Sequence, residues 1–376
     1  MRPKPAVVCV ALCGTYDLNL VRGAVSTALA PLGGMRRFVH EGMRVLLKPN
    51  LVNDAGPERA VTTHPAVVQV VAEMVQAAGG QVQLGDSPGG PISDNSRVYR
   101  GTGMAALAHS LGANLVFFDK AVRRQVGGND CFVASPILDA DLVINLPKLK
   151  THIFTLYTGA VKNLFGAVPG TRKRELHCEA PGVGAFSRIL VDVLDIVRPQ
   201  LSILDGVVGL EGNGPGTGGT LHGYGCIAAS EDPVALDAVA ARAMGFARGE
   251  VVHLALAANR GLGVADPTAV RIEGDRRALA FGELDLPKAR WYLDVPSWVG
   301  APVRWAARIR PRVLPSACIG CGRCVEVCPA QIISRGNPPT FDLRGCIGCM
   351  CCAEICPKGA ILVDRNLVAR LIGLGQ

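Results

Sequence analysis

Two short runs of cysteine close to the end of the sequence constrain this chain more than any other feature. The first run consists of Cys318, Cys321, Cys324 and Cys328 and is followed by Pro329. The second run consists of Cys346, Cys349, Cys352 and Cys356 and is followed by Pro357. Both have the spacing C-x2-C-x2-C-x3-C. Three thiolates two residues apart can surround one metal cluster, because the glycines between them allow tight turns.

This spacing is typical of bacterial ferredoxins, in which each run gives three ligands to one [4Fe–4S] cluster and its fourth cysteine to the other. We therefore expect two [4Fe–4S] clusters as cofactors. The expected ligands of the first cluster are Cys318, Cys321, Cys324 and Cys356. The expected ligands of the second cluster are Cys346, Cys349, Cys352 and Cys328. The alternative is a pair of structural zinc sites, but these usually combine two well-separated C-x2-C pairs.

Cysteine usage also indicates a compartment. The chain has 14 cysteines, and nine of them lie between Cys318 and Cys356. This clustering favours metal binding over a disulfide framework and a reducing environment over an oxidising one. The first apolar stretch is short and is followed by Asp17 rather than by a small-residue cleavage site, so we interpret it as a buried strand. We expect a cytoplasmic protein without a membrane-spanning helix.

The length of 376 residues favours more than one domain. We expect an α/β domain over residues 1–285, a Trp- and Arg-rich linker over 286–315 and a ferredoxin-type domain over 316–364. Residues 365–376 are typical of a helical tail. The linker contains Trp291, Trp298 and Trp305. We interpret it as a connector packed on the larger domain; contact with a membrane surface is the alternative, which its prolines disfavour.

Short β-branched runs alternate with helical patterns through the larger domain. The expected strands are residues 7–12, 44–49, 81–86, 114–119, 142–147, 201–206 and 225–230. The clearest helices are expected over residues 64–79, 186–198 and 232–245, with Asp232 as an N-cap. Nearly all-apolar strands in such alternation predict an α/β fold, with a parallel or mixed sheet covered by helices. A small C-terminal α+β ferredoxin-like domain should follow.

Polar segments follow several of these strands, where open α/β sheets bind their ligands. They are Lys-Pro-Asn at 48–50, Gly-Asp-Ser-Pro at 85–88, Pro-Lys-x-Lys-Thr-His at 147–152 and Lys-Asn-x-x-Gly at 162–166. In this order the segments resemble the family called domain of unknown function 362, which is often fused to a ferredoxin module. The resemblance covers roughly residues 5–285. It implies an α/β domain that receives or delivers electrons, without a general reaction or assigned catalytic residues.

The residues themselves suggest an anion site. The candidate catalytic residues are Lys148, Lys162, His152 and Asp86. The candidate substrate-binding residues are Lys48, Asn50, Lys150, Asn163, Asp205 and Glu211. Converging lysines would bind a carboxylate or phosphate, and the asparagines would add directional hydrogen bonds. The carboxylates could handle protons or hold a divalent metal. The alternative is that the lysines lie in solvated loops and the aspartates cap helices and turns.

The net charge of +8 allows an acidic small molecule, an anionic membrane surface or nucleic acid as a partner. Nucleic acid is not expected, because aromatic residues make up only 5% of the chain and no nucleic-acid-binding motif occurs. Arg172, Lys173 and Arg174 are interpreted as a solvated helix face, with docking of an acidic redox partner as the alternative. The glycine-rich segment 211–219 is interpreted as a turn or lid, because a strand rather than a helix should follow it.

These features favour an iron–sulfur oxidoreductase of the ferredoxin-dependent kind. It would take low-potential electrons from a redox partner protein and pass them from two [4Fe–4S] clusters to an anionic substrate in the α/β domain. The alternative is an electron-carrier adaptor whose α/β domain binds a partner protein or ligand without catalysing a reaction. A third, weaker interpretation is that the clusters are structural or sense oxygen.

Overall fold

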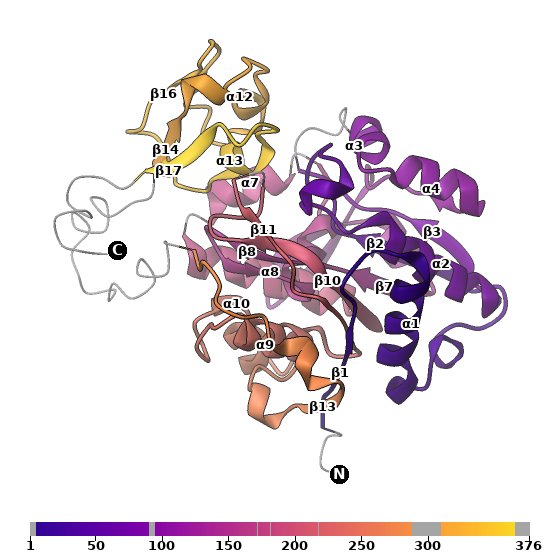
Figure 1. Ribbon diagram of the computed structural model, residues 1–376. Coiled ribbons are helices and arrows are strands. Elements are labelled where there is room, and N and C mark those ends of the chain that lie inside the picture. The colour runs from indigo at the N-terminus through magenta and orange to yellow at the C-terminus, as the bar shows by residue number, and fades with distance from the viewer. Residues whose placement is uncertain are drawn as a thin grey trace.

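The computed structural model describes residues 5–89, 95–170, 172–180, 182–216, 218–287 and 310–364. The three tryptophans of the expected linker and the expected C-terminal tail lie outside the described residues. The larger domain is built around one mixed sheet. The cysteine-rich module lies to one side of it, near helix α7 (Arg172–Glu179) and strands β8 (Lys148–His152) and β11 (Thr220–His222) (Figure 1).

The main path of the sheet has the strand order β13-β1-β12-β10-β7-β2-β3-β4. These strands are β13 Arg271–Gly274, β1 Val7–Leu12, β12 Cys226–Ser230, β10 Leu201–Glu211, β7 Leu142–Leu146, β2 Arg44–Pro49, β3 Gln81–Leu84 and β4 Asn114–Leu115. Neighbours from β10 to β4 run parallel, whereas β12 is antiparallel to both β10 and β1. The predicted α/β fold with a parallel or mixed sheet is therefore confirmed in its mixed form.

Helices cover both faces of this sheet. They are α1 Leu18–Leu29, α2 Pro65–Ala77, α3 Asn95–Gly101, α4 Met104–Leu111, α5 Ser135–Asp139, α6 Ala160–Asn163, α7 Arg172–Glu179, α8 Val183–Val197, α9 Pro233–Ala243 and α10 Val252–Asn259. In β1, Val8 and Val10 join the core under α8, α9 and α10, whereas Cys9 and Ala11 join the core under α1 and α2. This alternation explains why the central strands are apolar on both sides.

Local sequence signals fix the ends of these helices. The side chain of Asp232 accepts hydrogen bonds from the backbone N–H groups of Val234 (2.8 Å) and Ala235 (2.9 Å), so the N-cap expected from the sequence is present. Pro65 begins α2 after His64, whose ring accepts from the N–H of Ala66. None of the described helices is long and apolar enough to cross a membrane. The expected cytoplasmic location stays a prediction.

One segment differs from the expectation. Residues 147–152 were expected in the loop after a strand, but Lys148–His152 forms strand β8, with all five side chains buried. It pairs in parallel with the extended end of β10 and antiparallel with β9, Leu156–Thr158. The far end of β10 also pairs with β11, Thr220–His222, the strand expected after the glycine-rich segment. The sequence Lys-Leu-Lys-Thr-His suggests an exposed loop because it contains two lysines. In the structure both lysines are buried and hydrogen-bonded to specific polar partners.

The remaining strands lie outside the main sheet. β5 Ala121–Val126 and β6 Asn129–Ala134 form a hairpin. The cysteine-rich module contains the pairs β14 Arg310–Val313 with β17 Ile361–Asp364 and β15 Ile333–Ser334 with β16 Thr340–Phe341. Its short helices are α12 Arg323–Val327 and α13 Cys351–Ile355. Because β14 pairs with β17, residues 310–313 belong to the module and not to the linker expected over 286–315.

A buried carboxylate fixes helix α6, which carries Lys162. Asp237 of α9 accepts hydrogen bonds from the N–H groups of Ala160 (2.6 Å) and Val161 (2.8 Å) and from the Tyr157 hydroxyl (3.0 Å). Burial raises the pKa of Asp237 to about 7, against the opposing effect of these donors. A side chain at Gly159 would collide with Asp237 and Tyr157, so a glycine is required there.

We predict that Asp237→Ala lowers the free energy of unfolding by about 3 kcal/mol, because it leaves two helix N–H groups and one buried hydroxyl without an acceptor. Urea denaturation measures the change. Asp237→Asn is the matched control and should lose clearly less, since its amide oxygen still accepts. Equal stability of Asp237→Ala and the wild type would contradict the capping role.

Candidate functional site

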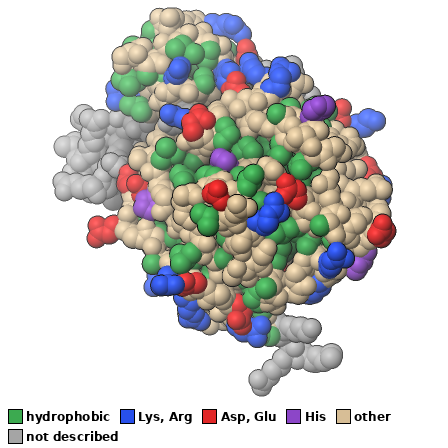
Figure 2. Space-filling model, turned by 45° about the vertical axis from the view of Figure 1, so that its right-hand side comes forward, with side chains coloured by type: hydrophobic (Ala, Val, Ile, Leu, Met, Phe, Trp, Pro, Cys, Tyr) green, Lys and Arg blue, Asp and Glu red, His purple; other side chains and the backbone are tan. Residues whose placement is uncertain are grey.

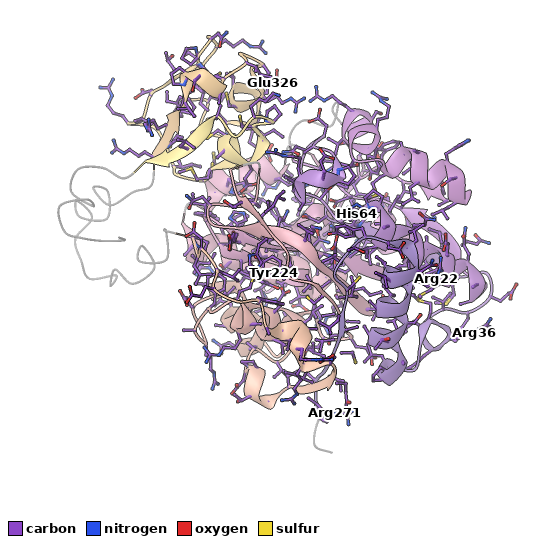
Figure 3. The ribbon with its side chains drawn as sticks, in the orientation of Figure 1. Arg22, Arg36, His64, Tyr224, Arg271 and Glu326 are labelled. Carbon is purple, nitrogen blue, oxygen red and sulfur yellow. The ribbon has the colours of Figure 1, made fainter. Side chains whose placement is uncertain are left out.

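A pocket of about 140 Å³ lies between the larger domain and the cysteine-rich module. The α/β domain contributes polar lining residues, which include Asn50, Asp86, His152, Lys162, Asn163, Lys173, Arg174 and His177. The module contributes Glu326, Val327, Cys351, Glu354 and Ile355. Figure 3 marks the position of Glu326 in the module, above the larger domain. The pocket therefore lies at the carboxyl edge of the parallel strands, where the sequence predicted a site.

Specific contacts hold the module against this edge. The guanidinium of Arg323 in α12 makes a two-point ion pair with Asp54, at 2.5 and 2.8 Å. The amide of Asn53 donates to the backbone oxygen of Glu354 at 3.2 Å. Met350 of the module packs against the buried Ile153 of the larger domain. These polar and apolar contacts close one side of the pocket.

His152 and Glu354 face each other across the junction, with Nε2 3.1 Å from Oε1. The Nδ1 atom of His152 accepts from the backbone N–H of Phe154, so its proton is on Nε2. Burial and the charge of Lys162 lower the pKa of His152 to about 4. Burial opposes ionisation of Glu354, but the charges of His152 and Lys162 lower its pKa below the ordinary value. The module thus contributes one carboxylate to a predominantly basic pocket.

Two lysines give the pocket its positive character. Lys162 lines it and makes no hydrogen bond or ion pair with any described residue; burial lowers its pKa, while the charge of Glu354 opposes that shift. Lys173 of α7 donates to the backbone oxygens of Ser87 and Pro88. Burial, together with the charges of Lys48 and Lys162, lowers the pKa of Lys173 to about 7. Lys173 can therefore exchange a proton near neutral pH.

A buried ion pair forms the back of the pocket. The Nζ atom of Lys48 lies 2.7 Å from Asp86 Oδ1, and both side chains are almost fully buried. Lys48 also donates to the backbone oxygen of Asn163 at 2.6 Å, and Asp86 accepts from the N–H of Leu51 at 2.8 Å. Asp86 lines the pocket, whereas Lys48 lies behind it. The pair joins the ends of β2 and β3 to helix α6.

Lys148 and Asp205 form a separate cluster. The Nζ atom of Lys148 lies 2.8 Å from Asp205 Oδ2 and donates to the Tyr16 hydroxyl at 2.6 Å. The Tyr16 ring stacks on His64, with ring centroids 3.6 Å apart, and Figure 3 labels this histidine. Neither Lys148 nor Asp205 lines the pocket. Their hydrogen bonds are made within the protein, which favours a structural role.

The other residues expected from the sequence also divide into those that line the pocket and those that do not. Lys150 is buried and donates to Asn50 Oδ1 (2.6 Å) and to the backbone oxygen of Val61 (2.7 Å), so it positions Asn50 from behind the pocket. Glu211 lies elsewhere, with one oxygen 3.5 Å from His222 Nδ1. The pocket therefore gathers five of the ten α/β residues named from the sequence. They are Asn50, Asp86, His152, Lys162 and Asn163.

Sequence reasoning missed Lys173, His177 and Glu354. Lys173 was grouped with Arg172 and Arg174 as a solvated helix face, but Arg172 is partly buried and pairs with Glu175 and Glu179 of the same helix, and Lys173 lines the pocket. The spacing of Lys173 and His177, four residues apart on one helix, was the available signal that both share a face. No sequence signal pointed to Glu354, because its position in the pocket depends on how the module docks.

The eight cysteines of the two runs line two separate cavities. Cys318, Cys321, Cys324 and Cys356 line the first cavity. Cys328, Cys346, Cys349 and Cys352 line the second cavity. The fourth cysteines are thus exchanged between the runs, as the ferredoxin pattern requires. Among the described residues, no three His, Cys, Asp or Glu side chains are grouped closely enough to hold a single metal ion. The thiol-lined cavities fit iron–sulfur clusters.

These features define an α/β protein that carries a [4Fe–4S] dicluster module beside a basic pocket. The family model described as Domain of unknown function (DUF362) matches residues 45–242, just over half of the chain, and a 4Fe-4S dicluster domain matches residues 310–357. The chain belongs to the DUF362 family, as the sequence motifs predicted. A Synechocystis protein named thylakoid-associated protein sll1697 is 42% identical over 234 residues, which cover 60% of this chain and 70% of that protein.

Two solved structures share limited similarity with the chain. The lactate racemase apoprotein from Thermoanaerobacterium thermosaccharolyticum is 11% identical, with a TM-score of 0.35 over 53% of this chain and 50% of that one. A Thermotoga maritima protein is also 11% identical, with a TM-score of 0.32 over 52% and 51% of the two chains. The chain therefore spans about half the length of these structures.

We predict that Lys48→Met lowers the free energy of unfolding by about 3–5 kcal/mol, because it leaves the Asp86 carboxylate buried without its cation. The double variant Lys48→Met/Asp86→Asn should recover at least half of that loss, since the amide oxygen still accepts from Leu51. Denaturant titration of both variants measures the coupling. A single variant as stable as the wild type would show that the pair does not anchor the pocket.

Proposed function

We propose that this protein is a ferredoxin-dependent oxidoreductase and that its substrate is a small anion bound in the pocket between the two domains. One observation carries the proposal. The pocket contains the ammonium group of Lys162, which makes no hydrogen bond or ion pair with the described residues, and its wall includes Cys351, the residue directly before Cys352. An anion bound by Lys162 would therefore lie beside the expected ligands of the second cluster.

The 4Fe-4S dicluster domain is an iron–sulfur electron-transfer unit. We assign Cys318, Cys321, Cys324 and Cys356 to the first cluster and Cys328, Cys346, Cys349 and Cys352 to the second, following the cysteines that line each cavity. When bound, the clusters supply electrons one at a time. The rest of the proposed chemistry belongs to the side chains of the pocket.

Lys162 would bind the negative group of the substrate, because no described residue occupies its ammonium group. Asn163 would orient the substrate. Its Nδ2 donates to Asn145 at 2.8 Å, while its buried Oδ1 accepts no hydrogen bond from the described residues and is available to a substrate donor. Phe165 and Ile355 provide apolar walls that exclude water and strengthen these contacts.

Reduction of a substrate by single electrons usually requires protons as well. Lys173 is the candidate proton donor, because its pKa near 7 allows both protonation states at neutral pH. Asp86 keeps its ion pair with Lys48 and is better suited to shaping the pocket than to proton transfer. We therefore assign binding to Lys162, orientation to Asn163 and proton donation to Lys173. Lys148, Asp205 and Glu211 have no direct role in this proposal.

We predict about eight iron atoms and eight acid-labile sulfides per chain in anoxically purified protein, with the EPR signal of two interacting reduced clusters. Cys356→Ala should perturb the first cluster although Cys356 lies in the second cysteine run. Cys351→Ala is the matched control and should keep both clusters, because Cys351 lines neither cysteine cavity. Zinc without sulfide would contradict the assignment.

We predict that Lys162→Met weakens the binding of small carboxylates and phosphate by about tenfold, since it removes a charged partner. Calorimetry with a panel of such anions measures the affinity, and Lys120→Met, an exposed lysine that does not line the pocket, is the control. If Lys162→Met still delivers electrons to a partner at the wild-type rate, the adaptor interpretation is correct instead.

Anion binding should also depend on pH. Lys173 is cationic below its pKa of about 7 and neutral above it, so affinity should fall as the pH rises from 6 to 8. Lys173→Met should remove this dependence and bind weakly at every pH in that range. An affinity for the same anions that stays constant from pH 6 to 8 in the wild type would argue against Lys173 as a titrating group of the pocket.

A further inference from the structure

The two cysteine cavities differ in their access to solvent. In the first, Cys321 is exposed and the neighbouring Ile319 is 56% exposed, although it is a large apolar side chain. Both cavities also contain buried cysteines, Cys324 (8% exposed) in the first and Cys328 (7%) and Cys352 (8%) in the second, so the difference lies in Cys321 and Ile319. Met350, which also lines the second cavity, packs against the larger domain. The first cavity therefore faces outward, and the second lies on the side of the pocket.

Basic side chains lie at the rim of the first cavity, but most of them are paired with carboxylates. Lys358 is exposed, lines the first cavity and makes no ion pair with any described residue. Arg335 is exposed next to Gly322 and pairs with Glu326 at 2.9 Å. No carboxylate of the described residues lines the first cavity. Figure 2 shows Lys and Arg side chains on the module, at the top of the view, and where it meets the larger domain.

We infer that the surface formed by Ile319, Cys321, Arg335 and Lys358, named here the entry face, docks an acidic one-electron carrier protein. An exposed apolar residue beside an exposed lysine that makes no ion pair with the described residues is suited to transient docking of a protein with a negative rim. Charge complementarity favours an acidic protein over a second copy of this basic chain, whose net charge is +8.

The electron balance of each encounter is simple. The carrier would lose one electron, and Cys318, Cys321, Cys324 and Cys356 would hold the cluster that accepts it, with neither a bond nor a proton exchanged. The next electron needs a second reduced carrier. The order of the sites then runs from the entry face through the first and second cysteine cavities to the pocket. Only the final step, use of the electron in the pocket, rests on the proposed function.

The test uses the complete protein with both clusters and an acidic flavodoxin as the carrier. Titration of the two oxidised proteins measures binding without electron transfer. At low ionic strength, Lys358→Glu and Ile319→Ser should each weaken binding about fivefold or more, and salt should remove the effect of Lys358→Glu but not that of Ile319→Ser. The matched control is Arg36→Glu, an exposed charge reversal far from the module (Figure 3).

Stopped-flow reduction by flavodoxin hydroquinone gives the second readout. The entry-face variants should be reduced more slowly by the carrier and at the wild-type rate by dithionite, with unchanged iron and sulfide content. Wild-type flavodoxin affinity in both variants would overturn the inference, as would equal weakening in Arg36→Glu or binding of anionic phosphatidylserine vesicles in place of flavodoxin. Lys162→Met should bind flavodoxin normally, so a failure of the pocket proposal is distinguishable from a failure of the docking proposal.

Discussion

The pocket depends on one buried interaction, the ion pair between Lys48 and Asp86. Removing both charges from water is costly, and hydrogen bonds from Lys48 to Asn163 and from Leu51 to Asp86 offset that cost. The pair joins two strand ends to the helix that carries Lys162. Any side chain at Gly166 would collide with both members of the pair, so a glycine is needed at that close approach. Lys48, which the sequence suggested as a substrate-binding residue, instead supports the pocket from behind.

Much of the fold could be predicted from the sequence, because buried parallel strands are marked by continuous apolar runs and helices by proline and aspartate at their first turns. Strand β8 was missed for a physical reason. Its lysines are buried, and a buried lysine is recognised only when its partners are known, such as Asp205 for Lys148 or Asn50 for Lys150. The grouping of the cysteines around two cavities agrees with the ferredoxin spacing, and the ligand assignment stays a prediction, whereas the place of Glu354 in the pocket depends on domain docking.

The electrostatics of the pocket follow from its position between two domains. The larger domain brings Lys162, Lys173 and two histidines to one place, and burial disfavours the charged form of each. The module brings Glu354, which faces His152 and partly compensates the positive charge. An anion bound in the pocket would neutralise the remaining positive charge. The docked module therefore lines the pocket, and under the proposed function it would be a part of the binding site as well as an electron source.

Helix α13 lines both the pocket and the second cysteine cavity. Within five residues it supplies Cys352 to the second cysteine cavity and Cys351, Glu354 and Ile355 to the pocket. A molecule in the pocket and a cluster in that cavity would therefore contact the same short helix through different residues. The contacts of Arg323 with Asp54 and of Asn53 with Glu354 hold the module in this position. The second cysteine cavity and the pocket thus already lie beside one another, so the proposed electron delivery to the pocket would require no large movement of the module.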